Sequence, residues 1–392
     1  MGLKSKIDTI MVAPYCPAER GESIALGAAA KQRAILHGFS ACGRKTLLVN
    51  SGHQTAELKG ARLMRLARSV VELRMIQVSW RPLGKLLQSM LAPVAAFKLQ
   101  RRLRVPLIWV YNPYLFEALY VWGARLADSG TKIVLELEDM PLARRRLGLG
   151  RVKTWLDTLS LAYLKRQING ATVVQHAMRS AFSLAPDMIW YLPVLLTDQS
   201  AEAVQVGEGS VRVGYFGGLT LDKGADFLIQ VIRKSPSHCH WTVCGSGDYA
   251  VNLRRLQDDM PDRLRFLGAV AESIFVREYA GIQVLVNLHA PLADFGAGIF
   301  PFKLLEGVAA GKLVLSTGAA GCPSEVSGCI HWLKGNGVGD AVEALGNVFV
   351  LLHESARVRA EARDWVLDNF TAKIVIGRIL EVIKVIPRSL CY

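Results

Sequence analysis

The chain has 392 residues, more than one hydrophobic core usually serves, so we expect two domains of roughly 150 to 200 residues each. Although 51% of the residues are hydrophobic, no uncharged apolar run approaches the roughly 18 residues that would span a bilayer. The seven cysteines never form a CxxC pair, which argues against a disulfide framework and against a zinc ribbon.

The positive charge lies in the first half of the chain. Residues 1–200 contain 28 Lys and Arg against 13 Asp and Glu, a net charge of +15, whereas residues 201–392 contain 19 against 20, a net charge of −1. Such a one-sided field favours an anionic partner: nucleic acid, anionic lipid or a phosphorylated acceptor. We expect no nucleic acid partner, because no recognition motif for it is present.

The first residues, MGLKSKIDTIMVAPYCP, are basic, but Asp8 and Pro14 interrupt the apolar stretch. This pattern is unlike a secretory signal and is typical of a first β-strand, so we expect a cytoplasmic protein.

Along the rest of the first half, apolar runs alternate with segments of helical period, which is typical of βα units with a parallel sheet. The predicted strands cover residues 7–14, 45–51, 107–112, 132–139 and 171–177. The predicted helices include residues 24–37, 115–127 and 152–167.

The same pattern restarts after a polar stretch, residues 197–210, which we interpret as a linker. The second set of predicted strands covers residues 211–217, 240–245, 264–268, 283–288 and 312–317. The sequence therefore predicts an α/β protein of two Rossmann-like, doubly wound domains, residues 1–196 and 211–368. The last helix, within residues 369–392, could pack back on the first domain.

A glycine turn follows the strand that opens the second domain. In VGYFGGLTLDKGAD (residues 213–226), Gly217 and Gly218 follow the strand, and Lys223 stands just before the next helix. Glycines let backbone N–H groups approach phosphate oxygens, and the helix N-terminus adds positive potential. The turn could equally be a structural device with Lys223 on a solvated surface.

A second glycine loop precedes a predicted helix at residues 301–310. The loop contains Gly296, Ala297 and Gly298, and the helix carries Lys303 and, one turn later, Glu306. A carboxylate at the start of such a helix can accept hydrogen bonds from two ribose hydroxyls. The alternatives are a Glu that stabilises the helix dipole and an ordinary exposed lysine.

In this order, the segments GGLTLDKGADFL, HWTVCGSGD, RLRFLGAV and FPFKLLEGVAAGKLVLST resemble the donor domain of GT-B glycosyltransferases of family 4 (group 1). The resemblance covers about residues 211–330, and the first domain only in layout. It implies two Rossmann-like domains facing a central cleft, a nucleotide-sugar donor bound by the second domain, and no metal. The donor would be a UDP or GDP sugar.

The resemblance also assigns roles to residues. Lys223 matches the phosphate-binding lysine of the family, and Glu306 matches the second Glu of its E-x7-E pattern, which binds the ribose. The loop that meets the diphosphate and the sugar matches residues 296–298, and Gly217 and Gly245 match glycines of the turns.

Two positions depart from the family pattern. Gly298 stands where the first Glu is expected, and Gly218 where the family has a phosphate-binding Arg. Lys303, one turn before Glu306, could supply the missing positive charge.

In the first domain, Gly21 follows the first strand, where these enzymes bring a glycine loop close to donor and acceptor. The strand ending in ELED places Glu138 and Asp139 at its carboxyl end, where ligands of parallel sheets bind. Either carboxylate could contact the reacting sugar or take the proton of the acceptor hydroxyl. A metal-binding role for ELED remains a weaker alternative.

An arginine-rich stretch from Arg62 to Arg104 has Glu72 as its only acidic residue. Apolar residues between the arginines of its first part fit an amphipathic helix that lies in a membrane interface, or else a core helix with a basic outer face. We therefore expect an anionic membrane surface as a partner and a peripheral location on the inner face of the membrane.

Together these observations predict a retaining glycosyltransferase that moves a sugar from a nucleoside diphosphate sugar to a hydroxyl of a membrane-associated glycan or lipid-linked acceptor, as in polysaccharide biosynthesis. The alternatives are a non-catalytic glycan- or membrane-binding subunit of the same fold, and a GT-B sugar epimerase or phosphorylase.

Overall fold

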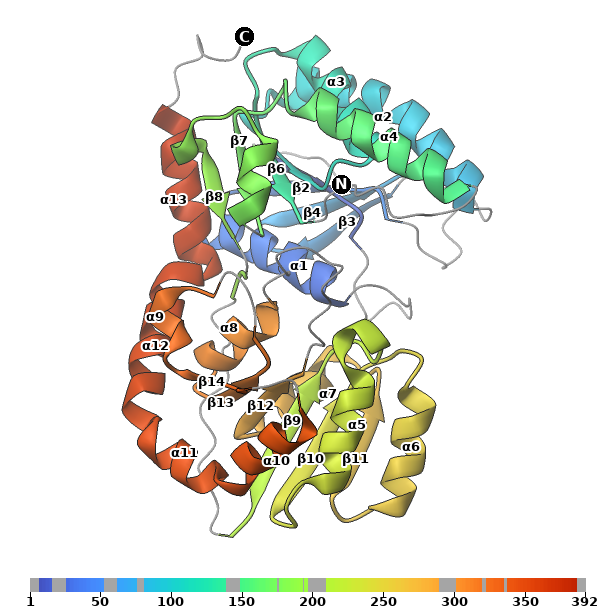
Figure 1. Cartoon of the computed structure of the whole chain (residues 1–392). Coiled ribbons are helices and arrows are strands. Elements are labelled where there is room, and N and C mark those ends of the chain that lie inside the picture. Colours follow the sequence, from blue (N-terminus) through green and yellow to red (C-terminus); the bar gives the residue numbers. More distant parts are fainter. Residues whose placement is uncertain are drawn as a thin grey trace. The chain divides into compact units, whose positions relative to one another are not determined.

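The computed structural model describes residues 7–15, 26–52, 62–75, 81–138, 149–174, 176–192, 194–196, 209–288, 301–318, 322–334 and 337–385. The chain divides into two compact units (Figure 1): Met1–Thr197 with Ala372–Tyr392 form unit 1, and Asp198–Thr371 form unit 2. Within the described residues, no helix has both the length and the apolarity needed to cross a membrane.

Unit 1 is built on an eight-stranded sheet in the order β3-β4-β2-β1-β5-β6-β7-β8. Its described pairings are parallel except for the antiparallel pair β3–β4. The central strands are buried along their whole length, as expected where helices cover both faces of a sheet. The strands are β1 (Thr9–Ala13), β2 (Thr46–Asn50), β3 (Arg62–Ala67), β4 (Val70–Arg74), β5 (Leu107–Tyr111), β6 (Lys132–Leu137), β7 (Gly170–Val173) and β8 (Ile189–Tyr191).

Helices cover both faces of this sheet (Figure 1). On one face lie α1 (Leu26–Ala41) and α13 (Ala372–Val385), which share a buried core with the strands. The other face carries α2 (Arg81–Leu103), α3 (Leu115–Ala127) and α4 (Leu149–Leu164). The chain rejoins unit 1 at Ala372, whose N–H donates to the carbonyl of Leu196 at 2.8 Å.

The helix expected in the first part of the arginine-rich stretch is wrong, because residues 62–74 form the hairpin β3–β4. Strand β4 buries alternate residues, Val70, Glu72 and Arg74, and pairs with β2 in parallel. Its arginine does not face lipid: Arg74 Nε lies 3.0 Å from Glu72 Oε2, and both side chains are buried. The strand period of two therefore outweighs the helical reading of the same apolar residues.

Unit 2 has an all-parallel sheet in the order β11-β10-β9-β12-β13-β14. Its first strand lies at the centre and the chain winds outward in both directions, which is the doubly wound Rossmann order. The strands are β9 (Val211–Phe216), β10 (Cys239–Cys244), β11 (Leu264–Gly268), β12 (Val284–Asn287), β13 (Leu313–Ser316) and β14 (Ile330–Trp332).

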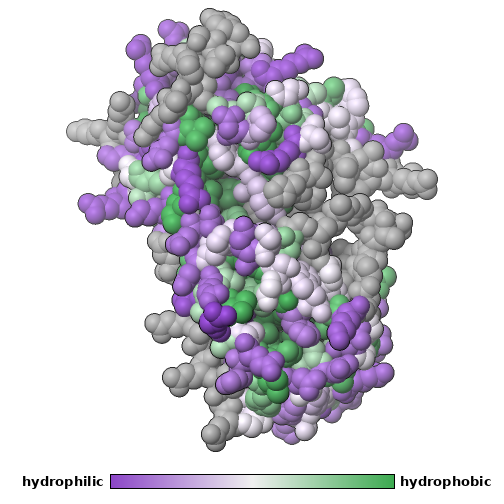
Figure 2. Space-filling model, turned by 60° about the vertical axis from the view of Figure 1, so that its left-hand side comes forward, coloured by the Kyte–Doolittle hydropathy of each residue, from purple (hydrophilic) through white to green (hydrophobic). Residues whose placement is uncertain are grey.

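The helices of unit 2 follow the strands in turn. They are α5 (Ala225–Lys234), α6 (Ala250–Asp259), α7 (Glu272–Ala280), α8 (Phe302–Ala309), α9 (Ser324–Ser327), α10 (Val338–Gly346), α11 (Val348–Glu354) and α12 (Ala356–Phe370). Buried apolar residues of these strands and helices form one core, centred on the side chains of β9, β10 and β12. On the face of the molecule shown in Figure 2, hydrophilic side chains form most of the protruding surface, with hydrophobic residues between them.

Candidate functional site

The strand order of unit 2 brings the segments that follow β9 and β12 to the same edge of the sheet. Strands β9 and β12 are neighbours, but the chain continues from β9 to β10 and from β12 to β13, toward opposite lateral edges of the sheet. The carboxyl ends of strands at such a switch point are where open α/β sheets bind ligands. The glycine turn after β9 and helix α8, the first described helix after β12, both belong to this region.

The turn after β10 packs so closely against the glycine turn after β9 that two of its positions exclude a side chain. A Cβ atom on Gly245 would lie 1.8 Å from the carbonyl oxygen of Gly217, and one on Gly247 would lie 2.3 Å from that of Leu219. The N–H of Gly217 donates to Cys244 O, and the N–H of Gly245 donates to Gly268 O. These two glycines therefore bring the turns after β9 and β10 together, and their N–H groups are used within the protein.

The hydroxyl of Tyr215 contacts backbone carbonyl groups at both ends of the glycine turn. This buried residue, next to last in β9, has its hydroxyl 2.9 Å from the carbonyl oxygen of Gly218 and 3.2 Å from that of Lys223. Both ends of the turn are thereby tied to one side chain. Lys223 ends a short 3-10 helix (η4, Leu221–Lys223), and Gly224, in the left-handed conformation with φ of 70°, starts α5.

Lys303, in the first turn of α8, lies above the glycine turn. Its Nζ is 4.4 Å from the centre of the Tyr215 ring and 3.6 Å from where a Cβ atom of Gly217 would lie. Removal from water, together with the positive charge of Lys223, lowers the pKa of Lys303 to about 7, while Glu306 opposes this shift. The positive charge of Lys223 therefore disfavours the charged form of Lys303, and an anion bound at this point would favour that form.

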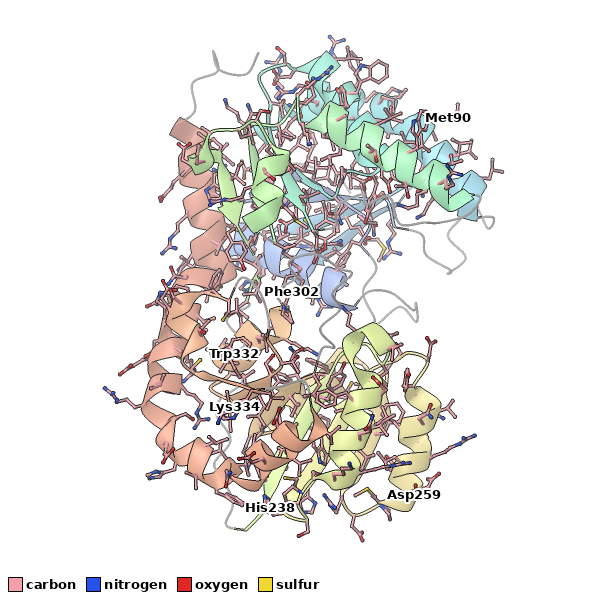
Figure 3. The ribbon with its side chains drawn as sticks, viewed as in Figure 1. Met90, His238, Asp259, Phe302, Trp332 and Lys334 are labelled. Carbon is pink, nitrogen blue, oxygen red and sulfur yellow. The ribbon has the colours of Figure 1, made fainter. Side chains whose placement is uncertain are left out.

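Glu306 lies one turn along α8 from Lys303. Its side chain is exposed to solvent. The protein around the carboxyl group nevertheless removes part of its hydration, which raises its pKa, and the charge of Lys303 opposes this rise. The same carboxylate helps to raise the pKa of the Tyr279 hydroxyl. Glu306 is therefore an accessible hydrogen-bond acceptor beside a cationic centre. Helix α8 begins at Phe302, which Figure 3 labels, and has no side-chain cap.

In unit 1, Glu138 follows directly on β6, and its N–H donates to Asn112 Oδ1 at 2.8 Å. Asn112, at the end of β5, has a φ of 61°, uncommon for a residue other than glycine. The preceding acid of ELED has a different role: Glu136 is buried, lies 2.5 Å from Lys31 Nζ, and accepts a hydrogen bond from Thr172. Glu138 is thus the described ELED carboxylate that lies beyond the strand end.

The remaining predicted site residues, Gly21, Asp139 and residues 296–298, lie outside the described residues. Among the residues that are described, no cluster of three or more His, Cys, Asp or Glu side chains could hold a metal ion. The sequence reasoning missed Tyr215; the available signal was a tyrosine within an apolar strand, since a buried hydroxyl needs a partner.

Comparisons with known proteins agree with this geometry. Two doubly wound units, the second with a glycine turn at its switch point, make up the GT-B fold, as the sequence predicts. Residues 210–367 match the family model of glycosyl transferases group 1. The chain therefore has the GT-B fold, and its second unit carries the match to the group 1 family. No curated protein matches its sequence.

Solved structures share the fold over nearly the whole chain. The sucrose-phosphate synthase of Thermosynechococcus elongatus matches with a TM-score of 0.66 and 12% identity, covering 96% of this chain and 99% of that one. A glycosyltransferase from Rickettsia africae gives 0.66 and 12%, covering 97% and 98%. Anabaena HepE in complex with UDP gives 0.66 and 13%, covering 97% and 100%.

Proposed function

We propose that the chain is a glycosyltransferase that binds the diphosphate of a nucleoside diphosphate sugar at the glycine turn of unit 2 and transfers the sugar to an acceptor hydroxyl. The observation that carries the proposal is the position of Lys303 over Tyr215 and Gly217, with Lys223 close enough to lower its pKa. A diphosphate placed between the two lysines would remove their mutual repulsion. HepE, which has the same fold, was solved with UDP and with UDP-glucose, so a UDP sugar is the first donor to test.

In this proposal Lys303 replaces the arginine that the family resemblance places at position 218. Gly218 has no side chain to offer, but Lys303 reaches the adjacent Gly217 from α8. A lysine is a point charge and lacks the bidentate geometry of a guanidinium. Donor binding should therefore depend more on charge, and so on salt, than in a relative with the arginine.

Glu306 is proposed to accept hydrogen bonds from the ribose hydroxyls. Its carboxylate is open to solvent and one helical turn from Lys303. Because the two groups are on one helix, a nucleotide that places its diphosphate at Lys303 would have its ribose within reach of Glu306. The loop of residues 296–298 is proposed to meet the diphosphate and the sugar through its amides.

The transfer would follow the retaining course that the family 4 resemblance implies. The bond between the anomeric carbon and the diphosphate oxygen breaks, and the diphosphate leaves with the electron pair. The anomeric carbon bonds to the acceptor oxygen on the same face, and the acceptor hydroxyl gives its proton to the carboxylate of Glu138 or Asp139. Lys223 and Lys303 would stabilise the departing diphosphate, so that a metal is not needed. Glu138 and Asp139 are the proposed contacts of the acceptor hydroxyl.

We further propose a glycan or lipid-linked acceptor held at a membrane, with the protein peripheral on the cytoplasmic face. The net charge of +15 in residues 1–200 supports an anionic surface as partner.

The experiment is a binding and turnover screen with UDP, GDP, CMP and their sugars. A bound nucleotide stabilises the folded protein by RT ln(1 + [L]/Kd), so the melting temperature should rise with the matching nucleoside diphosphate. The matching sugar donor should then be hydrolysed slowly or transferred. Donor binding without any turnover would favour the alternative of a non-catalytic subunit, and turnover that needs inorganic phosphate would favour a phosphorylase.

A further inference from the structure

Helix α2 has its apolar residues on the outside. Its exposed face carries large hydrophobic side chains: Leu83 (40% exposed), Leu86 (53%), Leu87 (39%), Met90 (64%), Leu91 (42%) and Val94 (52%). The spacing of three and four residues puts them on one stripe of the helix. Figure 3 labels Met90 on this outer side.

The inward face of α2 is small or polar. Gly84, Gln88, Ala92, Ala96 and Gln100, each four residues after the last, are buried. Small residues are needed because α2 crosses α3 closely: a Cβ atom on Gly123 of α3 would lie 2.1 Å from the carbonyl oxygen of Pro93. Gln100 donates to the Val105 carbonyl oxygen and to Thr131 Oγ1. The fold of unit 1 therefore does not depend on the leucines of the outer stripe.

Helix α4 repeats this reversed pattern. Val152 (53% exposed), Trp155 (61%) and Leu159 (47%) face outward, while Asp157 and Ser160 are buried. Helix α3 packs against both α2 and α4, so the three helices form one layer. We call the outward apolar residues of α2 and α4 the apolar face.

The apolar face lies toward one edge of the sheet. A helix that follows a strand of a parallel sheet runs back along it, so the helix begins at the carboxyl edge of the strands. The apolar stripe begins in the first turn of α2 and ends just past its middle, and Val152 and Trp155 lie in the first half of α4. Glu138, the proposed contact of the acceptor, is at the same edge, after β6.

Positive charge surrounds the apolar face. On α2 itself, Lys85 stands beside the leucines, and Lys98, Arg101 and Arg102 continue the exposed side toward the helix C-terminus. Arg151 and Lys153 lie near the start of α4, where Lys153 also pairs with Asp157. Helix α2 has no Asp or Glu among its residues.

These charges decide which partner fits. A second copy docked face to face through a two-fold contact would bring the same cations together, which is unfavourable. An anionic bilayer satisfies both features, because the acyl region accepts the apolar residues and the head groups pair with the cations. We infer that the apolar face of α2 and α4 docks on the surface of an anionic lipid bilayer, with these side chains inserted below the head groups. The docking itself does not depend on the proposed function. Only its purpose does, which is to hold the sheet edge that carries Glu138, the proposed acceptor contact, at the membrane.

The test uses the full chain and vesicle sedimentation. Wild-type protein should bind vesicles of phosphatidylcholine with 30% phosphatidylglycerol, and the triple variant Leu86→Gln/Met90→Gln/Trp155→Gln should bind at least about tenfold more weakly. The matched control is Val251→Gln/Val350→Gln, which changes side chains of similar exposure (58% and 54%) in unit 2 and should bind like the wild type. Lys85→Gln/Lys98→Gln should lower binding at low salt and reduce its salt dependence.

Two outcomes would overturn the inference. One is vesicle binding by the triple variant equal to that of the wild type. The other is a wild-type dimer, seen by sedimentation velocity, that the triple variant converts to a monomer while neither protein binds vesicles, since the face would then join two copies. Vesicle binding is read without donor turnover, so an inactive protein that still binds vesicles would contradict the proposed function and leave this inference standing.

Discussion

Lys303 Nζ lies 4.4 Å from the centre of the Tyr215 ring, and the hydroxyl of Tyr215 lies within hydrogen-bond distance of the carbonyl oxygens of Gly218 and Lys223. One aromatic side chain thus supports both the turn and the cation above it. The ring face stabilises the lysine charge, which burial and Lys223 oppose. The result is a lysine whose protonation should respond to an anion at the turn.

The first prediction concerns protons taken up when nucleotide binds. The pKa of Lys303 is lowered to about 7, so at pH 8 the free protein holds this lysine mostly neutral. A bound diphosphate should raise the pKa and protonate it. Calorimetry in buffers of different ionisation enthalpy at pH 8 should show uptake approaching one proton per nucleotide, and affinity should fall as pH rises above about 7.

Lys303→Arg should keep nucleotide binding but abolish this proton uptake, because arginine stays charged. Lys303→Gln should weaken binding by at least about tenfold, or about 1.4 kcal/mol. The control is Lys334→Gln, which removes an exposed lysine of the same unit. It should change neither the nucleotide affinity nor the proton uptake. Proton uptake that persists in Lys303→Arg would assign it to another group.

The second prediction concerns the ribose. If Glu306 accepts hydrogen bonds from the ribose hydroxyls, the wild type should prefer the ribonucleotide over its 2′,3′-dideoxy analogue by about ten- to hundredfold. Glu306→Gln should lose most of this preference, while affinity for the dideoxy analogue changes little. An equal preference in both proteins, measured by calorimetry, would remove Glu306 from the ribose contact.

The third prediction concerns the glycine turn. Gly245→Ala would force a Cβ atom to 1.8 Å from the Gly217 carbonyl oxygen, so the turns after β9 and β10 must separate. We expect a loss of unfolding free energy of more than about 2 kcal/mol in urea titrations. Gly339→Ala, where nothing lies within 4 Å of the added atom, is the matched substitution and should stay within about 0.5 kcal/mol.

The fourth prediction concerns Glu117 in unit 1. This residue is buried and accepts a hydrogen bond from Ser51 at 2.7 Å, and burial raises its pKa to about 7. Between about pH 4.5 and pH 7 the folded state therefore holds a proton that the unfolded state has lost, so the contribution of Glu117 to stability falls as pH rises through this window.

Glu117→Gln should flatten this part of the stability curve and raise the unfolding free energy at pH 8 by as much as about 3 kcal/mol. Glu361→Gln, which changes an exposed carboxylate on α12, should leave the curve unchanged. A wild-type protein whose stability rises from pH 5 to pH 7 by an amount that Glu117→Gln does not alter would contradict the prediction.

Much of the fold could be predicted because buried strands appear in the sequence as continuous apolar runs. Strands such as β1 and β9 are covered by helices on both faces, so their apolar runs are continuous and bounded by polar residues or glycine. Helix α3 was predicted with the bounds that it has in the structure. Short edge strands such as β14, with three residues, carry too few residues for a period to be recognised.

Two features could not be predicted, for physical reasons. In α2 the apolar stripe faces outward, so the usual rule that apolar residues mark the core assigns the wrong side. The contact of Lys303 with Tyr215 joins residues 88 positions apart, and it exists because β9 and β12 are neighbours in the sheet. The sequence suggested a charge at Lys303, but its position over the turn required the strand order.

The most direct test of the central claim compares each nucleoside diphosphate with its nucleoside. If the proposed site in unit 2 binds the diphosphate, UDP or GDP should bind at least about a hundredfold more tightly than uridine or guanosine, measured by calorimetry at pH 7. Lys303→Gln combined with Lys223→Gln should remove most of this difference while leaving the weak nucleoside affinity in place. Equal binding of diphosphate and nucleoside by the wild type, or a difference that survives the loss of both lysines, would contradict the account.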